Sequence, residues 1–220
     1  MIDVLFVIAS RIEMQPDKSN VHLELLRRAV ESIEQHFGLH RNQQVMIVDS
    51  DSPYREHIPA YRSREFVMFE DAHNKNYEAG AWLHAYRTQV AETYVFMHDS
   101  CYVTENFSNL LSRDVTVWKP YRSWKCIYER QKRWVFDALQ STKWHNVLNK
   151  FTTVQGAIYS ARRSVLERLY NEGLQDILPQ NKDQSMGYER LIGNVLTQEG
   201  FGALMVDEPL KLQKTFAGRR

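Results

Sequence analysis

Hydrophobic residues in the first half of the chain form two patterns, short continuous runs and longer stretches with helical spacing. The runs occupy positions 4–9, 45–48, 66–69 and 94–97. They are apolar on both faces, which is typical of strands buried inside a parallel sheet. Between the first two runs, apolar residues recur every three or four positions from Leu23 to Phe37. This spacing predicts a helix with Asn20 as its N-cap and Gly38 at its end. A second helix is predicted over 77–90.

The second half of the chain is less regular. A strand-like segment at 152–159 leads into a predicted helix at 161–170. A polar loop at 180–184 then precedes a helix at 187–198 and a final strand at 203–206. Strands that alternate with helices indicate an α/β fold, with a mostly parallel or mixed central sheet and helices on both faces. A chain of 220 residues suits a single domain of this kind.

Composition narrows the class of protein. Hydrophobic residues make up 43% and charged residues 25%, which is typical of a globular chain, and the formal net charge of +1 gives no support to binding of nucleic acid. We find no segment long enough to cross a bilayer, so we expect a cytoplasmic protein. The two cysteines, Cys101 and Cys126, are interpreted first as reduced thiols, and a single disulfide bridge between them stays open.

Polar side chains follow each of the four predicted strands of the first half. The residues at these strand ends are Ser10 and Arg11, then Asp49, Ser50, Asp51 and Ser52, then Glu70, Asp71, His73, Asn74 and Asn76, then His98, Asp99 and Ser100. Ligands of open parallel sheets bind at the carboxyl ends of the strands. These acids, amides and hydroxyls suit a ribose, a base edge and a metal-bound diphosphate, so we expect a binding cleft here.

Asp99 is the strongest single candidate in this set. It ends a buried strand, which fixes a carboxylate at the edge of the sheet, and Mg²⁺ or Mn²⁺ commonly bridges such a carboxylate to substrate phosphates. A turn-capping role for Asp99 is the structural alternative.

The order of these motifs resembles the nucleotide-binding half of GT-A glycosyltransferases, especially the large inverting, family-2-like group. The resemblance covers most of the chain and implies a single Rossmann-like GT-A domain, with residues 1–103 as the nucleotide-binding half and 104–220 as the acceptor and catalytic half. It implies that the loop of Ala9, Ser10 and Arg11 holds the nucleotide. It also implies that Asp49 contacts the base or ribose, with Asp51 close by.

The same resemblance identifies the helix start from Asn76 to Ala81, including Gly80, as part of the donor site. An Asp-x-Asp motif carries the metal and diphosphate in this family. Here the motif reads His98-Asp99-Ser100, with one carboxylate where two are usual. Asp99, with His98 or Ser100 beside it, is the expected site for Mn²⁺ or Mg²⁺. The departure also fits a non-catalytic nucleotide- or sugar-binding module, or a degenerate transferase domain of a larger assembly.

In the second half, the segment 153–163 is similar to the family's strand, glycine and arginine-bearing helix start. Gly156 is the position where the backbone would approach the donor sugar or acceptor, and Arg162 and Arg163 are considered as phosphate contacts. By the same resemblance Glu189 is the candidate general base, and Asp183 is the second choice. The structural alternative for Glu189 is stabilisation by the helix dipole in the first turn of a helix. The family implies a UDP-sugar donor, a glycan or other hydroxyl acceptor, and inversion at the anomeric carbon.

A group of aromatic residues suggests where an acceptor could bind. Trp118, Tyr121, Trp124 and Tyr128 are a candidate platform for sugar stacking, although aromatic residues also build cores. Basic residues lie among and after them: Lys119, Arg122, Lys125, Arg130, Lys132 and Arg133. They fit either an anionic acceptor or a solvated surface.

Two rival enzyme classes are disfavoured. A nucleotidyltransferase normally has a glycine-rich basic loop after its first strand, and residues 9–13 contain no glycine. A dinucleotide-dependent oxidoreductase would carry Gly-x-Gly-x-x-Gly, which the chain lacks.

Overall fold

A computed structural model describes residues 1–12, 21–118, 120–121, 129–140, 142, 144, 153–154, 158–198, 201, 203–206 and 212–214. The strands of its main sheet are β1 (Ile2–Ser10), β2 (Gln43–Asp49), β3 (Val67–Asp71), β4 (Ala91–His98), β6 (Val115–Trp118), β9 (Tyr159–Arg162) and β10 (Leu204–Val206). Two short two-stranded ladders pair β5 (Cys101–Val103) with β11 (Leu212–Lys214), and β7 (Pro120–Tyr121) with β8 (Thr153–Val154).

The main sheet has seven strands in the order β10-β6-β9-β4-β1-β2-β3. Pairing is parallel from β4 through β1 and β2 to β3, and also between β10 and β6, whereas β9 runs antiparallel to both of its neighbours. The sheet is therefore mixed and mostly parallel, and the prediction of an α/β fold is confirmed.

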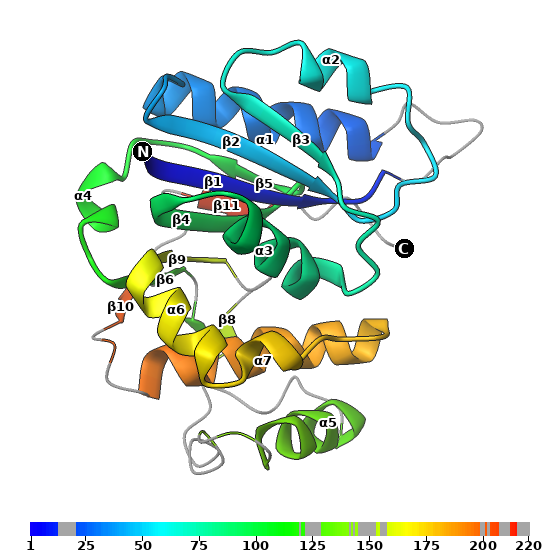
Figure 1. Ribbon diagram of the computed structural model, residues 1–220, viewed down its shortest axis with the longest axis vertical. Coiled ribbons are helices and arrows are strands. Elements are labelled where there is room, and N and C mark those ends of the chain that lie inside the picture. The colour runs from blue at the N-terminus through cyan, green and yellow to red at the C-terminus, as the bar shows by residue number, and fades with distance from the viewer. Residues whose placement is uncertain are drawn as a thin grey trace.

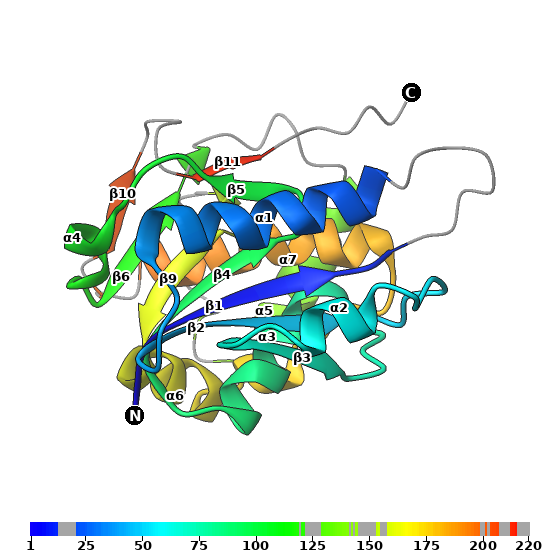
Figure 2. The same ribbon diagram turned by 90° about the horizontal axis from the view of Figure 1, so that it is seen from above.

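Helices cover both faces of this sheet (Figure 1). On one face lie α1 (Val21–Phe37) and α2 (Ile58–Arg62), and on the other lie α3 (Tyr77–Thr88), α6 (Arg163–Asn171) and α7 (Lys182–Gln198). The helix α5 (Glu129–Gln140) packs outside α7, α4 (Ser108–Leu111) lies at one edge, and a 3-10 turn, η4, spans Leu174–Asp176. Seen from above, α1 lies along the strands and beside β5 (Figure 2).

Two hydrophobic cores result, one on each face of the sheet. Alternate side chains of a strand point to opposite faces, so Leu5 and Val7 join the core under α3, α6 and α7, whereas Phe6 and Ile8 join the core under α1. All four are completely buried. Burial on both faces explains why these strands are continuous apolar runs.

In the first half, β1 to β4, α1 and α3 lie where strands and helices are predicted, with ends that differ by a few residues. The structure adds α2 and β5, and the predicted N-cap Asn20 lies outside the described residues. The second half differs in particular places. The predicted strand at 152–159 is found as β8 and β9, which are separate strands in different sheets. The predicted loop at 180–184 is wrong in part, because α7 already begins at Lys182. The side-chain oxygen of Asn181 accepts a hydrogen bond from the amide of Gln184 at 3.0 Å and caps the helix.

Candidate functional site

The strand registers bring the predicted rim residues together. Ser10 pairs with Asp49 across β1 and β2, Asp49 pairs with Asp71 across β2 and β3, and Ala9 pairs with His98 across β1 and β4. The carboxyl ends of four adjacent parallel strands therefore lie at one edge of the sheet. Backbone hydrogen bonds extend this order into the loops, from the Ser50 amide to the Ser10 carbonyl at 2.8 Å and from the Asp99 amide to the Ala9 carbonyl at 3.2 Å.

Asp99 directly follows β4 on this edge and is partly exposed. Its Oδ2 accepts hydrogen bonds from the Ser10 hydroxyl and from the Arg11 amide, both at 3.3 Å. Burial raises the pKa of the Asp99 carboxyl, and the hydrogen bonds from Arg11 and Ser10 partly offset that effect. The loop after β1 thus orients this carboxylate, and a bound cation would favour its ionised form.

Asp49 has a different place from the one expected of a base- or ribose-binding residue. Its side chain is completely buried, and it accepts hydrogen bonds from the Ser52 amide at 2.9 Å and from the Ser52 hydroxyl. The Ser52 hydroxyl in turn accepts a hydrogen bond from the Ile12 amide at 2.7 Å. The buried Asp49 carboxylate therefore fastens the loop after β1 to the loop after β2. This positioning role replaces the expected direct contact with a nucleotide. The outward-facing groups of the second loop are Ser50 and Asp51.

Replacement of Asp49 by alanine should destabilise the apo protein by about 2–3 kcal/mol, because it leaves the Ser52 amide and hydroxyl buried without their acceptor. Chemical denaturation would measure the change. Asp51→Asn is the control, since the Asp51 side chain is 54% exposed and should change the free energy of unfolding by less than about 0.5 kcal/mol. Equal effects of the two substitutions would contradict the positioning role.

The loop after β3 is fastened to the same edge by Asn74. Its Nδ2 donates to the Ser50 hydroxyl at 3.0 Å and to the Tyr77 carbonyl at 2.5 Å, and its Oδ1 accepts from the Asn76 amide at 2.9 Å. Asn76 then donates from its Nδ2 to the Pro179 carbonyl at 3.2 Å, which links the start of α3 to the segment before α7. Asn76 thus helps to hold the two halves of the chain together at the rim.

Gly80 is required by this arrangement. A Cβ atom at position 80 would lie 2.0 Å from the Asn74 Oδ1 and 2.8 Å from the Asn76 Cβ. Gly80→Ala should therefore cost about 2 kcal/mol of stability through overpacking, measured by chemical denaturation. In an Asn74→Ala background, which removes the nearest atom, the same change should cost clearly less. An equal cost in both backgrounds would show that the Asn74 contact is not the cause.

Backbone strain collects at the same rim. Four described non-glycine residues have positive φ, and three of them lie at this rim: Asp51 at 61° and His73 at 44° in the loops, and Tyr77 at 55° at the start of α3. Such conformations persist where the surroundings over-determine them, and they cluster at functional sites. His73 also lies near two carboxylates, with its Nδ1 3.8 Å from Asp51 and 3.7 Å from Asp71.

His98 connects the rim to the second half of the chain. It is the last residue of the buried strand β4, and its ring packs edge-on against Trp82 with centroids 6.2 Å apart. Trp82 also contacts Tyr188 of α7 at 6.2 Å. The first turns of α3 and α7 therefore lie at the edge of the sheet that carries Asp99 (Figure 1).

The two candidate bases both lie on α7, but at different distances from the start of the helix. Asp183 is in the first turn of the helix and not in a loop, and it forms an ion pair with Arg130 of α5 at 2.8 Å. Glu189 lies about two turns into the helix instead of opening it, with a side chain 18% exposed and 3.4 Å from Arg190. Because Glu189 is beyond the first turn, stabilisation by the helix dipole does not explain its presence.

Glu78 is a residue that sequence reasoning missed. It lies in the first turn of α3, is 4% exposed, and accepts a hydrogen bond from the buried Ser185 hydroxyl, which lies 3.0 and 3.1 Å from its two oxygens. Burial and the negative charge of Glu189 raise the pKa of Glu78 to about 7. A glutamate at a helix start carries no sequence signal that separates it from a favourable dipole contact.

The raised pKa of Glu78 predicts a pH dependence of stability. Between about 4.5 and 7 the folded protein retains a proton that the unfolded chain has lost, so the free energy of unfolding falls as pH rises. At about 1.4 kcal/mol per pH unit the interval corresponds to about 3 kcal/mol. Glu78→Gln should remove this loss, which denaturation of both proteins at pH 5 and pH 8 would measure. Parallel pH dependence in the two proteins would contradict the raised pKa.

The expected acceptor platform is only partly described. Trp118 is 1% exposed and belongs to the core under α1, so its proposed stacking role is corrected to a packing role. The structure does not describe the side chain of Tyr121. Outside the described residues lie Trp124, Tyr128 and Gly156, and also Lys119, Arg122, Lys125 and Cys126. Cys101 is buried.

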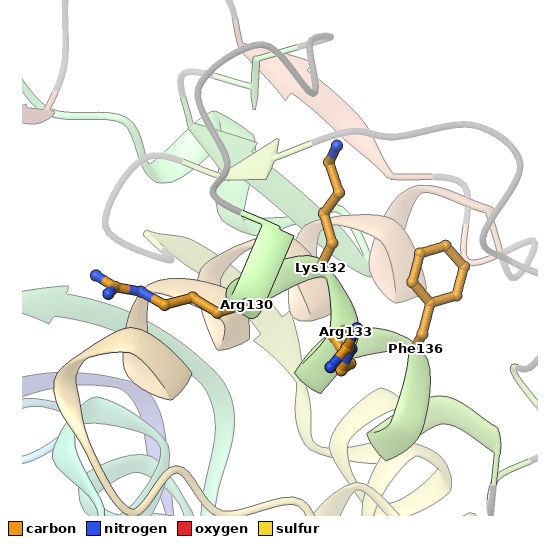
Figure 3. A pocket seen from close by; sticks show the side chains of 4 residues that line it. All are labelled: Arg130, Lys132, Arg133 and Phe136. Atoms are coloured by element: carbon orange, nitrogen blue, oxygen red, sulfur yellow. The ribbon is translucent and has the colours of Figure 1, made fainter.

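The remaining basic residues of the expected acceptor surface lie on α5. Arg130, Lys132, Arg133 and Phe136 line a hollow of about 430 Å³ on this helix (Figure 3). Phe136 is 38% exposed. Arg130 extends away from Lys132 and Phe136 and pairs with Asp183, so this surface adjoins the first turn of α7.

Arg162 and Arg163 are far from the rim. Arg162 pairs with Thr93 near the start of β4 and lies 3.7 Å from Glu92, while Arg163 donates to the Tyr94 hydroxyl at 2.6 Å. Both therefore lie toward the amino end of β4, opposite Asp99. The expectation that either contacts a phosphate at the rim is wrong, because β9 runs antiparallel to β4 and carries its last residues away from that edge.

Within the described residues, no group of three or more His, Cys, Asp or Glu side chains could hold a metal ion. None of the described helices is both long and apolar enough for a membrane span.

Comparison with known proteins rests on structure, because no protein-family model and no curated protein sequence matches the chain. The structure of S. aureus TarS residues 1–349 in complex with UDP-GlcNAc matches with a TM-score of 0.61 at 10% identity, over 100% of this chain and 60% of that one. Uncomplexed TarS 1–349 matches with a TM-score of 0.59 at 11% identity, over 97% and 60%.

GalNAc-T7 with UDP, GalNAc and Mn²⁺ matches with a TM-score of 0.61 at 14% identity, over 98% of this chain and 44% of that one. The chain thus spans three fifths or less of the length of these solved structures. The match extends over almost all of this chain, with identities that establish the fold alone. The chain has the GT-A fold of these glycosyltransferases.

Proposed function

We propose that the chain transfers a sugar from a nucleotide-diphosphate donor, with a UDP-sugar favoured, to the hydroxyl of a glycan or similar acceptor. The observation that carries this proposal is the shared edge of four parallel strands, where Asp99 is partly exposed and oriented by the loop after β1. The GT-A fold supports it, since the related TarS and GalNAc-T7 structures contain UDP-GlcNAc and UDP with Mn²⁺, respectively.

The donor side consists of the loops that meet at this edge. Ala9, Ser10 and Arg11 would contact the nucleotide from one side, and Ser50 with Asp51 from the other, while Asn76 and Gly80 shape the wall between them. Asp49 supports both loops from below. The residues fit one divalent cation, Mn²⁺ or Mg²⁺, with Asp99 as its carboxylate ligand and His98 beside it. When bound, such a cation neutralises charge on the departing diphosphate.

On the acceptor side, Glu189 accepts the proton of the attacking hydroxyl. Its place on a rigid helix near the rim allows a fixed position relative to the donor, and holding both substrates in line lowers the entropic part of the barrier. Direct displacement with one base inverts the anomeric configuration. Asp183 is the second candidate, although its ion pair with Arg130 engages it in the apo protein.

A non-catalytic nucleotide- or sugar-binding module is the second candidate function. The observation in its favour is the single carboxylate at the metal position, together with the absence of a three-residue metal-binding group among the described residues. The donor itself would then supply most of the ligands of any cation.

Calorimetry with UDP, in the presence and absence of Mn²⁺, followed by release of UDP from a panel of UDP-sugars, separates these functions. Metal-dependent binding with turnover of at least one donor supports a transferase. Metal-dependent binding without turnover favours the module. Failure to bind UDP under either condition overturns the UDP-sugar donor and the uridine-binding form of the module.

A further inference from the structure

The helix α5 has two faces of opposite character. On the inner face, Gln131, Val135 and Leu139 recur every four residues, and all three are completely buried. This face packs on α7, where the Gln131 Nε2 donates to the Met186 sulfur at 3.5 Å. The outer face carries the cations and the phenyl ring that line the hollow (Figure 3). Packing on α7 therefore fixes which side chains of α5 face outward.

The hollow combines positive charge with an aromatic ring. Among the described residues, three cations and one phenyl ring line its volume of about 430 Å³, and no acid does. This volume falls within the range of small-ligand sites. Lys132 and Phe136 are four residues apart and extend to the same side of the helix, and Arg133 lies one turn before Phe136. Phe136, at 38%, is the most exposed of the described Phe, Tyr and Trp side chains.

The positive charge of this surface is only partly balanced. Arg130 pairs with Asp183 at 2.8 Å. Arg133 is exposed, and its guanidinium forms no hydrogen bond or ion pair with a described residue, although Asp137 lies four positions further along the helix. On a helix that is merely solvated, opposite charges at this spacing tend to pair. An anionic ligand would supply the missing counter-charge.

The hollow adjoins the acceptor side of the proposed site. α5 lies beside the first half of α7, on the side away from the sheet (Figure 1). Its Arg130 reaches Asp183, and roughly 9 Å along α7 separates Asp183 from Glu189. The donor side meets the same region, since Asn76 donates to the Pro179 carbonyl just before α7. A chain-like acceptor that lies over the hollow would thus run toward the candidate bases.

We propose that the surface of Lys132, Arg133 and Phe136 binds an anionic glycan as the acceptor, a sugar chain that carries carboxylate or phosphate groups. The proposal rests on the transferase function proposed above and names the class of its acceptor. Guanidinium and ammonium groups bind both kinds of anion through charge-assisted hydrogen bonds. The Phe136 ring offers a hydrophobic face on which the C–H groups of a sugar ring can pack. A neutral glycan would leave the cations unused, and a polyanion without sugars would leave the ring unused.

Calorimetry in the absence of a donor tests this binding directly on the full chain. The probes are hexagalacturonate, which carries carboxylates, phosphorylated maltohexaose, which carries phosphates, and neutral maltohexaose. At least one anionic probe should bind about tenfold or more tightly than maltohexaose, and added salt should weaken its binding. The tighter anionic probe identifies the anion of the acceptor. Equal affinities for neutral and anionic probes, or no binding of any probe, would overturn the proposal.

A double substitution on α5 locates the charge that matters. Lys132→Gln with Arg133→Gln should abolish the preference for the anionic probe, and it spares Arg130, which is already paired. Arg41→Gln with Arg113→Gln is the matched control, because it removes the same charge from two exposed positions outside the hollow. The control should keep the preference, and both variants should bind UDP as the wild type does. Equal losses in the two variants would show that net charge, and not this surface, attracts the probe.

A substitution of the ring separates a glycan from other polyanions. Phe136→Ala should weaken binding of the anionic glycan about three- to tenfold. It should change the binding of inorganic polyphosphate, which has no sugar ring, by less than about twofold. If polyphosphate binds as tightly as the glycans and Phe136→Ala affects neither, the surface is a general polyanion site and the anionic glycan is refuted.

Failure of this inference differs from failure of the transferase function. A chain that turns over a UDP-sugar but binds neither anionic probe refutes the anionic acceptor and leaves the transferase in place. A chain that binds an anionic glycan through this surface but turns over no donor retains the glycan-binding surface and refutes its role in transfer.

Discussion

Replacing Asp99 by asparagine should weaken metal-dependent UDP binding by about two to three orders of magnitude, while the stability of the apo protein changes little. Asparagine keeps an oxygen that accepts from the Ser10 hydroxyl or the Arg11 amide, so the loop after β1 retains its anchor. It lacks the negative charge that a divalent cation requires of its ligand. Calorimetry with UDP and Mn²⁺ would measure the affinity, and thermal denaturation without ligand would measure stability.

Asp114→Asn is the matched control for this prediction. Asp114 is an exposed acid directly before β6, at the opposite edge of the sheet, and lies 3.6 Å from Arg162. The variant should bind UDP and Mn²⁺ as the wild type does. An unchanged affinity for UDP in Asp99→Asn would remove Asp99 from the site, and with it the reason for placing the diphosphate at this edge.

Replacing Glu189 by glutamine should lower kcat about 10²- to 10⁴-fold on a donor that the wild-type chain turns over, with UDP affinity changed by less than about threefold. The substitution preserves the shape of a half-buried side chain on α7 but removes the proton acceptor. Donor binding is proposed to depend on the loops at the sheet edge, whereas Glu189 lies about two turns into α7. Steady-state kinetics and calorimetry on the same preparation would test both halves of the expectation.

Asp183→Asn distinguishes the two candidate bases, since both lie on α7 and both changes remove a single charge. Asp183 is paired with Arg130, so its loss should release α5 locally and raise KM for the acceptor more than it lowers kcat. If Asp183→Asn lowers kcat as strongly as expected for Glu189→Gln, and Glu189→Gln does not, the roles must be exchanged.

The rim of the candidate site was predictable because strand ends are visible in sequence. The run before His98 is apolar on both faces, as expected of a strand inside the sheet. The first polar residues after this run therefore mark the point where the strand leaves the sheet. Parallel pairing then requires Ser10, Asp49 and Asp99 to share an edge. The direction in which each side chain points was not predictable. Asp49 turns inward because the Ser52 amide and hydroxyl need a buried acceptor. In the sequence, an aspartate at a strand end looks the same whether its side chain points inward or toward solvent.

Residues of the second half were harder to place because their partners lie far away in the chain. The side chain of Asn181 caps α7. In the sequence, the same polar residues are typical of a loop. Arg162 and Arg163 resemble phosphate ligands at a helix start, yet the antiparallel direction of β9 places them at the wrong edge.

By itself, the sequence determined the alternation of strands and helices, the class of fold and the edge of the sheet that carries the polar loops. Those features depend on local periodicity, because the spacing of hydrophobic residues only a few positions apart indicates which face of a strand or helix is buried. The tertiary structure alone decided that Glu78 meets Ser185, 107 positions away, and lies within reach of the charge of Glu189. The proton affinity of a carboxyl depends on the water it loses and the charges it gains, and both are supplied by segments that only folding brings together.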